Sequence, residues 1–211
     1  MFDYPAGHRR ASHKTSTANI QRSSPKKKAA TRYGSRGISL EERINNSNQY
    51  YLAQNIAVIH KKPTPVQVVK VDYPRRSAAK IVEAYYRHAS TTDYNGVYQG
   101  KYIDFEVKET KNKTSFPLAN IPEHQIAHMQ NCYNQGGYVF LIISFSSHDK
   151  VFLLPFAQLR KHLDHHQQQS LTYEFIEENG FECPQGIFPM IDYLEALENY
   201  IDTQMMGGCS R

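Results

Sequence analysis

The sequence predicts one α/β domain, and three observations predict it. A chain of 211 residues, 40% of them hydrophobic, is long enough to bury one well-sized core. Apolar and polar residues alternate strictly from Ile103 to Lys108, which is the pattern of a strand with two different faces. The segment Ser39-Leu40-Glu41-Glu42 has capping-box spacing, which predicts that a helix begins there and runs to about Gln54.

The remaining elements follow from similar patterns. Strands are expected over residues 56–59, 66–71, 138–145 and 151–156. Helices are expected from Ile121-Pro122, with the proline at the first helical position, and over residues 157–166, 171–179 and 192–201. The side chains expected to face the core are Leu40, Ile44, Tyr51 and Leu52 in the first helix, and Ile126, Met129 and Tyr133 in the helix after Pro122.

Positive charge is concentrated at the N-terminus. Residues 1–36 hold nine Lys and Arg against one acid, whereas residues 37–211 hold sixteen against nineteen, so their net charges are +8 and −3. Residues 1–33 contain few branched aliphatic side chains, which predicts a disordered tail ahead of a domain over residues 34–211. The tail is either a solubilising segment or an arm that contacts a polyanion such as DNA.

The cysteines and the apolar segments indicate the compartment. Cys132, Cys183 and Cys209 are odd in number and lack C-x-x-C spacing, so we expect neither a zinc site nor a disulfide framework. That usage is typical of a reducing cytosol. The N-terminus lacks the apolar run of a signal peptide, and the longest apolar stretch, Tyr138–Phe145, is too short to span a bilayer. We therefore expect a cytoplasmic protein with no membrane partner.

The alternating segment is the stretch around which the chain is organised. Ile103, Phe105 and Val107 lie on one face of the predicted strand, and Asp104, Glu106 and Lys108 lie on the other, giving a half-buried strand with one charged face. A two-residue turn at Gln99-Gly100 would fix the register so that the numbers of facing residues sum to 199. Asp93 then faces Glu106, and Thr91 faces Lys108.

Facing carboxylates need compensation. Two carboxylates about 5 Å apart repel by roughly 3 kcal/mol at an effective dielectric constant of about 20. Either one of them is protonated, or a cation lies between them. The all-oxygen set Thr91, Asp93 and Glu106 suits Mg²⁺, with Mn²⁺ as a substitute, and Lys108 would point at an anion held by the metal. A rival turn at Asn95-Gly96 would instead pair Asp93 with Tyr98 and separate the two acids.

A basic segment with aromatic residues follows the strand predicted over residues 56–59. From His60 to His88 there are seven Lys and Arg against two acids, with three tyrosines and three prolines interleaved. A strand with Val66, Val68 and Val71 is followed by a turn, and Ile81 to Tyr86 is either a returning strand or a short helix. The segment is either an ordinary charged hairpin or a projection that contacts phosphates and stacks on unpaired bases.

These residues carry a family resemblance. An acid ahead of a strand that bears E-x-K resembles the PD-(D/E)xK nuclease core. The strings S-T-T-D-Y-N-G from Ser90 and Y-I-D-F-E-V-K-E-T-K-N-K-T-S-F-P-L from Tyr102 are similar to the RecU family of Holliday junction resolvases, as are R-G-I-S-L-E from Arg36 and I-A-V-I-H-K-K-P-T-P-V-Q from Ile56. The similarity runs from about Tyr33 to the last helix.

The resemblance implies a fold and a set of site residues. It implies a restriction-endonuclease-like mixed sheet flanked by helices, with a basic stalk over residues of about 61–88, and it favours the strand reading of Ile81 to Tyr86. It implies metal ligands at Asp93 and Glu106, completed by Thr91 and Gln125, with Lys108 stabilising the transition state. Glu41 either approaches the metal or serves the dipole of its helix.

The implied activity is that of a crossover junction endodeoxyribonuclease, which makes paired nicks in four-way DNA during recombinational repair and chromosome segregation. A two-fold symmetric junction implies a homodimer, and the family implies interplay with the RecA recombinase. The residues expected to contact DNA are Lys61, Lys62, Tyr73, Arg75, Arg76, Lys80, Lys111 and Lys113. Two other readings stay open, namely a non-catalytic protein that binds junctions or modulates RecA and a nuclease for ordinary duplex.

Overall fold

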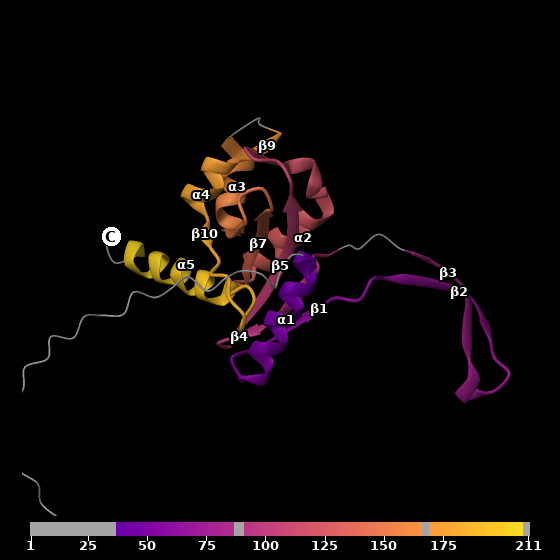
Figure 1. Cartoon of the computed structure of the whole chain (residues 1–211). Coiled ribbons are helices and arrows are strands. Elements are labelled where there is room, and N and C mark those ends of the chain that lie inside the picture. Colours follow the sequence, from indigo (N-terminus) through magenta and orange to yellow (C-terminus); the bar gives the residue numbers. More distant parts are fainter. Residues whose placement is uncertain (1–36, 87–90, 166–168, 209–211) are drawn as a thin grey trace, which may run out of the picture. The chain divides into compact units, whose positions relative to one another are not determined.

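The computed structural model describes residues 37–86, 91–165 and 169–208, and its centre is a six-stranded sheet (Figure 1). The predicted disordered tail, residues 1–33, lies outside the described residues. The strand order is β1-β4-β5-β7-β8-β10. Their bounds are Ala57–Lys61 for β1, Tyr94–Tyr98 for β4, Lys101–Thr110 for β5, Tyr138–Phe145 for β7, Lys150–Pro155 for β8 and Phe181–Glu182 for β10.

The sheet is mixed. β5 and β7 run parallel, and the other neighbouring strands run antiparallel. The parallel pair needs a crossover, and the helix α2 (Glu123–Asn134) supplies it. A central mixed sheet with helices on both sides confirms the predicted α/β class.

The helices divide between the two faces. α1 (Leu40–Ala53) and α5 (Tyr193–Gly208) pack on the face formed by Ile103, Phe105 and Val107. α2, α3 (Phe156–His165) and α4 (Tyr173–Asn179) pack on the other face, against β7 and β8. A small sheet of β6 (Ser115–Pro117) and β9 (Ser170–Thr172), with the short helix η2 (Leu118–Asn120), borders this second core.

The helix starts follow the sequence signals closely. Ser39 caps α1, and its hydroxyl accepts a hydrogen bond from the backbone amide of Glu42, as the capping box predicts. Pro122 is the residue before α2 and not its first helical residue, so that start was predicted one residue too early. The last helix continues to Gly208, seven residues beyond its predicted end.

Two residues predicted to face the core are exposed. Leu52 and Tyr133 are 54% and 42% exposed, whereas Ile44, Tyr51 and Met129 are buried. Both residues lie in the last turn of their helices, α1 and α2. Residues 170–172, at the start of the helix predicted over residues 171–179, instead form strand β9.

The register around the central turn is confirmed. Tyr94 faces Phe105 and Tyr98 faces Lys101, so the numbers of paired residues sum to 199. Gln99 and Gly100 have φ values of 48° and 73°, which is the left-handed backbone that a two-residue hairpin turn of this kind requires. The rival turn is excluded because Gly96 lies inside β4, where a Cβ atom would come within 2.1 Å of the carbonyl oxygen of Val58.

The expectation that β5 is only half buried was wrong. Asp104 and Glu106, on its charged face, are 0% and 1% exposed. β5 is a central strand of the sheet. Its charged face is covered by α2, whose His128 contacts Asp104. Two acids are therefore held in the interior, where they need compensating partners.

The basic segment forms a separate two-stranded sheet. β2 (Val66–Asp72) pairs with β3 (Lys80–Tyr86), and the turn between them contains the short helix η1 (Arg76–Ala78). The returning-strand reading of residues 81–86 is therefore confirmed. Every position of both strands is exposed, including Tyr85 and Tyr86.

Within the described ranges, no helix is both long and apolar enough to cross a membrane.

Candidate metal and catalytic site

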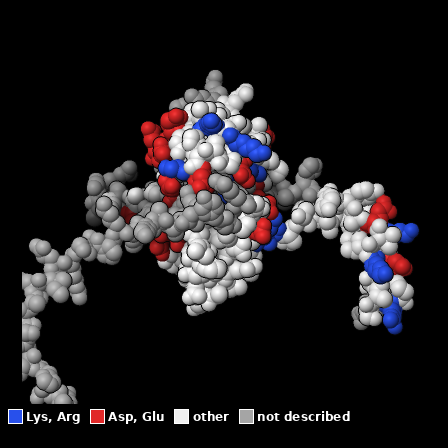
Figure 2. Space-filling model, in the orientation of Figure 1, with Lys and Arg blue, Asp and Glu red and all other residues white. Residues whose placement is uncertain are grey.

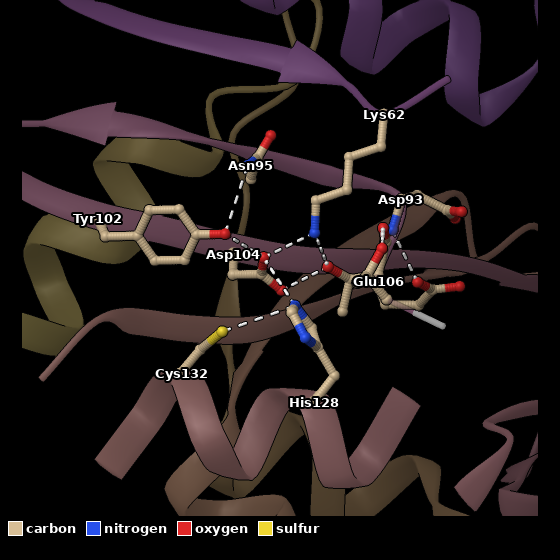
Figure 3. A network of polar contacts seen from close by, with 10 residues as sticks. Lys62, Asp93, Asn95, Tyr102, Asp104, Glu106, His128 and Cys132 are labelled. Carbon is tan, nitrogen blue, oxygen red and sulfur yellow. Dashed lines mark hydrogen bonds and ion pairs between the residues drawn. The ribbon is translucent and has the colours of Figure 1, made fainter. Parts of the chain in front are cut away.

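The two acids identified from the sequence lie next to each other. Asp93 immediately precedes β4, and its backbone amide donates a hydrogen bond to Oε2 of Glu106 at 3.0 Å. The confirmed register brings them together, because Tyr94, the next residue, faces Phe105. Figure 3 shows Asp93 beside Glu106, with the hydrogen bond from the Asp93 backbone to the Glu106 carboxylate.

Lys108 completes the cluster on β5. Its Nζ lies 2.6 Å from Oε1 of Glu106. Burial raises the pKa of Glu106 from 4.5 to about 7; the Lys108 ammonium lowers it, and the neighbouring Asp93 carboxylate raises it further. One face of β5 thus presents a carboxylate that is costly to ionise when no metal is bound, beside a second carboxylate and an ammonium.

The raised pKa predicts a pH-dependent effect of Glu106→Gln on stability. A carboxyl whose pKa is raised on folding costs stability as it ionises, so the cost is small near pH 5 and grows as the pH rises through about 7. We expect Glu106→Gln to raise the melting temperature of metal-free protein by a few degrees at pH 8 and by less at pH 5. Thermal unfolding in the presence of a chelator measures both values.

A matched variant tests the cause of that effect. Glu178→Gln removes a carboxylate from α4, where the residue is exposed, and should leave the melting temperature nearly unchanged at both pH values. A Glu106→Gln variant that is equally or less stable than the starting protein at pH 8 would contradict the conclusion that the ionised Glu106 carboxylate destabilises the metal-free protein.

Gln125 brings an unused acceptor to the same face. It lies in the first turn of α2 and is buried, and its side-chain oxygen Oε1 has no hydrogen-bond partner among the described residues. A buried carbonyl oxygen without a donor is costly, and a cation is one way to satisfy it. Thr91 is partly buried, and its hydroxyl donates to the carbonyl oxygen of Thr92 at 3.4 Å.

Glu41 and Lys61 lie on the α1 side of the sheet. Their side chains form an ion pair in which both are about half exposed. Alternation along β1 places Lys61 on the same face as the buried Ala57 and Ile59, which pack on α1. The structure therefore gives Glu41 a cationic partner on the face opposite Glu106, and its approach to the metal stays a prediction.

Asp104 is the centre of a second polar cluster (Figure 3). Its Oδ1 accepts a hydrogen bond from the Thr92 hydroxyl, and its Oδ2 lies 2.8 Å from Nζ of Lys62. Lys62 also donates to the Thr92 hydroxyl at 2.9 Å, and its backbone amide donates to the carbonyl oxygen of Asp93 at 2.7 Å. Asp104, Lys62 and Thr92 therefore hold the segment that carries Asp93.

Three further side chains reach Asp104 or lie beside it. The Tyr102 hydroxyl donates to Oδ2 at 2.8 Å, and Nε2 of His128 lies 3.2 Å from the same oxygen. The Cys132 sulfur lies 3.5 Å from His128 Nε2. Together these groups surround a fully buried carboxylate with donors.

Sequence reasoning missed this second cluster. It did not connect His128 with Cys132, although Cys132 follows it by four residues, a spacing that places both on one helix face. Asp104 was assigned to the charged face of β5, but which helix covers that face depends on the crossover. The i, i+4 spacing of histidine and cysteine was the available signal.

Most of the residues expected to contact DNA fall into two groups. Lys111 and Lys113 are exposed in the loop after β5, and Tyr73, Arg75 and Lys80 are exposed in the β2–β3 hairpin. Figure 2 shows lysine and arginine side chains along this hairpin, with acids among them. The side chain of Arg76 lies outside what the structure describes. Lys62 differs from these exposed residues, because its ammonium donates hydrogen bonds to Asp104 and Thr92 within the protein.

Comparison with known proteins identifies the family. The family model for RecU, described as Recombination protein U, matches residues 35–199. The chain belongs to the RecU family. This RecU match spans the acid pair, the Asp104 cluster and the β2–β3 hairpin.

RecU relatives are similar over most of their length. The chain is 51% identical to the Holliday junction resolvase RecU of Leuconostoc citreum over 202 residues, which cover 95% of this chain and 98% of that one. It is 55% identical to the protein of that name from Lactiplantibacillus plantarum over 184 residues, covering 86% and 89%. The solved structure of Hjc, a Holliday junction resolvase from Archaeoglobus fulgidus, gives a TM-score of 0.39 at 9% identity, covering 65% of this chain and 92% of that chain.

Proposed function

We propose that this RecU-family chain is a Mg²⁺-dependent endonuclease that resolves four-way DNA junctions by paired symmetric nicks. The observation that carries the proposal is the pairing of Asp93 with Glu106 beside the Lys108 ammonium. The curated relatives are named Holliday junction resolvases, which supports the choice of substrate. Recombinational repair and chromosome segregation are the processes that need such an activity.

The residues present fit a hard divalent cation. Asp93 and Glu106 would be the main ligands, and the unpartnered Gln125 oxygen would be a third, with Thr91 completing an all-oxygen set. Oxygen ligands suit Mg²⁺, and Mn²⁺ would substitute for it. When bound, the ion polarises the scissile phosphate and lowers the pKa of a water molecule.

The protein side chains have separate roles in this mechanism. Glu106 is held by the Asp93 amide and the Lys108 ammonium, so its carboxylate is fixed before substrate arrives. Lys108 stabilises the additional negative charge of the pentacovalent phosphorus or positions the attacking water. Lys62, through Asp104 and Thr92, keeps the backbone of Asp93 in place, so we assign it a positioning role in addition to the predicted DNA contact.

DNA binding in this proposal uses the exposed basic and aromatic groups. Lys111 and Lys113 would contact the phosphate backbone beside the acids, and Lys61 would contribute positive charge on the α1 side of the sheet, where it pairs with Glu41. The hairpin would contact phosphates through Arg75, Arg76 and Lys80 and stack Tyr73 on bases unpaired at the crossover. Two matched incisions on a two-fold symmetric substrate call for a homodimer. The proposal extends to cytoplasmic localisation and, from family membership, to RecA as a partner.

Shortening the hairpin is expected to reduce junction preference. Replacing residues 73–80 with a two-residue Asn-Gly turn joins β2 to β3 and removes Tyr73, both arginines and Lys80. Stacking is worth about 1–3 kcal/mol per base, so the ratio of junction to duplex affinity should fall by about 10-fold or more. Competition binding with a junction and a linear duplex measures that ratio.

The body of the protein should fold normally in this variant. Every position of β2 and β3 is exposed, and neither strand belongs to the six-stranded sheet. A far-UV circular dichroism spectrum and a melting temperature close to those of the full chain provide the control. An unchanged junction preference in a folded variant would favour a nuclease for ordinary duplex.

A further inference from the structure

Three potential metal ligands converge at a point separate from the Asp93 and Glu106 pair. They are a carboxylate oxygen of Asp104, one imidazole nitrogen of His128 and the Cys132 sulfur, and these three atoms all lie within 4.8 Å of one another. Asp104 comes from β5, and the other two lie one turn apart on α2, which covers β5. Figure 3 shows the three side chains pointing toward one another.

Their spacing matches that of ligands around one tetrahedral ion. Zinc lies about 2.0–2.1 Å from a histidine nitrogen, about 2.3 Å from a cysteine sulfur and about 2.0–2.2 Å from a carboxylate oxygen. At tetrahedral angles, such bonds place neighbouring ligand atoms roughly 3.3–3.6 Å apart. The sulfur lies 3.5 Å from His128 Nε2, and that nitrogen lies 3.2 Å from Asp104 Oδ2. The ligand atoms of Asp104 and Cys132 lie within 4.8 Å of each other, so this third pair would close around an ion.

The chemistry of this set differs from that of the acid pair. A thiolate and an imidazole favour Zn²⁺ or Co²⁺ over Mg²⁺, whereas Asp93, Glu106 and Gln125 offer only oxygen. Three protein ligands leave a fourth position for water, and the partly exposed His128 side chain gives access from solvent. We propose that Asp104, His128 and Cys132 form a second metal site, selective for a borderline or soft divalent transition ion. This proposal departs from the sequence-based expectation that no cysteine contributes to a zinc site.

Binding at this site would compete with a protein cation. Lys62 and Tyr102 both donate to Asp104 Oδ2, the oxygen nearest His128. An incoming ion repels the Lys62 ammonium and displaces it from this oxygen, while the Cys132 thiol releases its proton to solvent as the sulfur–metal bond forms. Lys62→Gln removes the competing charge and should therefore tighten metal binding.

The site also bears on the proposed nuclease activity. Asp104 and Lys62 hold Thr92 and the backbone of Asp93, so occupation of the second site loosens the segment that carries a proposed Mg²⁺ ligand. This step rests on the proposed function, whereas the metal site itself does not. We expect one equivalent of Zn²⁺ to slow Mg²⁺-dependent junction cleavage by several fold.

Titration of the metal-free full chain with Co²⁺ tests the site directly. Tetrahedral Co²⁺ bound to a thiolate gives a charge-transfer absorption and strong visible bands, and we expect these to saturate at one ion per chain and to disappear on adding Zn²⁺. Cys132→Ser should abolish the charge-transfer absorption, His128→Gln should weaken binding at least about tenfold, and Cys209→Ser should bind as the full chain does.

Several outcomes would overturn the second site. They are the absence of a thiolate–cobalt absorption, its persistence in Cys132→Ser, or its loss in Cys209→Ser. In the cleavage assay, Zn²⁺ inhibition of Cys132→Ser equal to that of the unmodified chain would show that inhibition comes from elsewhere. If the unmodified chain cleaves no junction at all, the nuclease proposal fails, while the absorbance titration still decides whether the metal site exists.

Discussion

Asp93→Asn is expected to abolish Mg²⁺-dependent incision of a four-way junction while leaving junction binding within a few fold of normal. The substitution keeps the size of the side chain and the backbone amide that holds Glu106, but it removes one of two carboxylates. Metal stabilisation of the transition state is worth several kcal/mol, and each 1.36 kcal/mol is tenfold in rate, so a fall of about 1000-fold is expected. Single-turnover cleavage of a labelled junction measures the rate, and a gel-shift assay with Ca²⁺ measures binding.

A second aspartate provides the matched control. Asp164 lies on α3, is 44% exposed and pairs with Arg160 one turn earlier, so Asp164→Asn removes the same charge from a solvent-facing position. It should cleave at the normal rate. Normal cleavage by Asp93→Asn would show that the acid pair is not the catalytic site. Equal losses of binding and cleavage would instead indicate that Asp93 serves DNA binding or folding.

Asp104→Ala is expected to cause the largest loss of stability. The substitution leaves the Lys62 ammonium, 18% exposed, without its carboxylate partner and removes an acceptor from Thr92, Tyr102 and His128. Breaking a buried ion pair from one side costs about 3–5 kcal/mol. For a chain of this size that lowers the melting temperature by roughly 6–20 °C. Thermal or urea unfolding of the metal-free protein measures the change.

Two milder substitutions separate the charge from the hydrogen bonds. Asp104→Asn keeps an acceptor oxygen and the volume of the side chain, so it should cost less than Asp104→Ala. Tyr102→Phe removes one donor from Oδ2 and should cost about 1 kcal/mol. An Asp104→Ala protein as stable as the unmodified chain would contradict the idea that Asp104 organises this face of the sheet.

The acid pair could be located from sequence because short-range rules determine it. The Gln99-Gly100 turn sets the register, and period-two alternation places Glu106 and Lys108 on one face of β5. The same rules placed Ser39 at the start of α1. These features depend on contacts between residues that are close in sequence, and the pattern of residue types records them.

What the sequence did not reveal depends on tertiary packing. The alternation along β5 shows that Asp104 and Glu106 share one face of the strand, but it does not show that α2 covers this face. The burial of Asp104 and Glu106 was therefore not predicted. The pairing of Lys62 with Asp104 joins residues 42 positions apart, and no local pattern in the sequence records it. His128 and Cys132 acquire a third partner only when the parallel β5–β7 pair brings α2 back across the sheet.

The central claim is that Asp93 and Glu106 support metal-dependent incision of four-way junctions. Its most direct test is single-turnover cleavage of a synthetic mobile junction beside a linear duplex of identical sequence, with Mg²⁺ and with a chelator. The account predicts paired nicks at symmetric positions of the junction with Mg²⁺, little cleavage of the duplex and none of either with the chelator. Tight junction binding without incision at any Mg²⁺ concentration, or equal cleavage of both substrates, would contradict it.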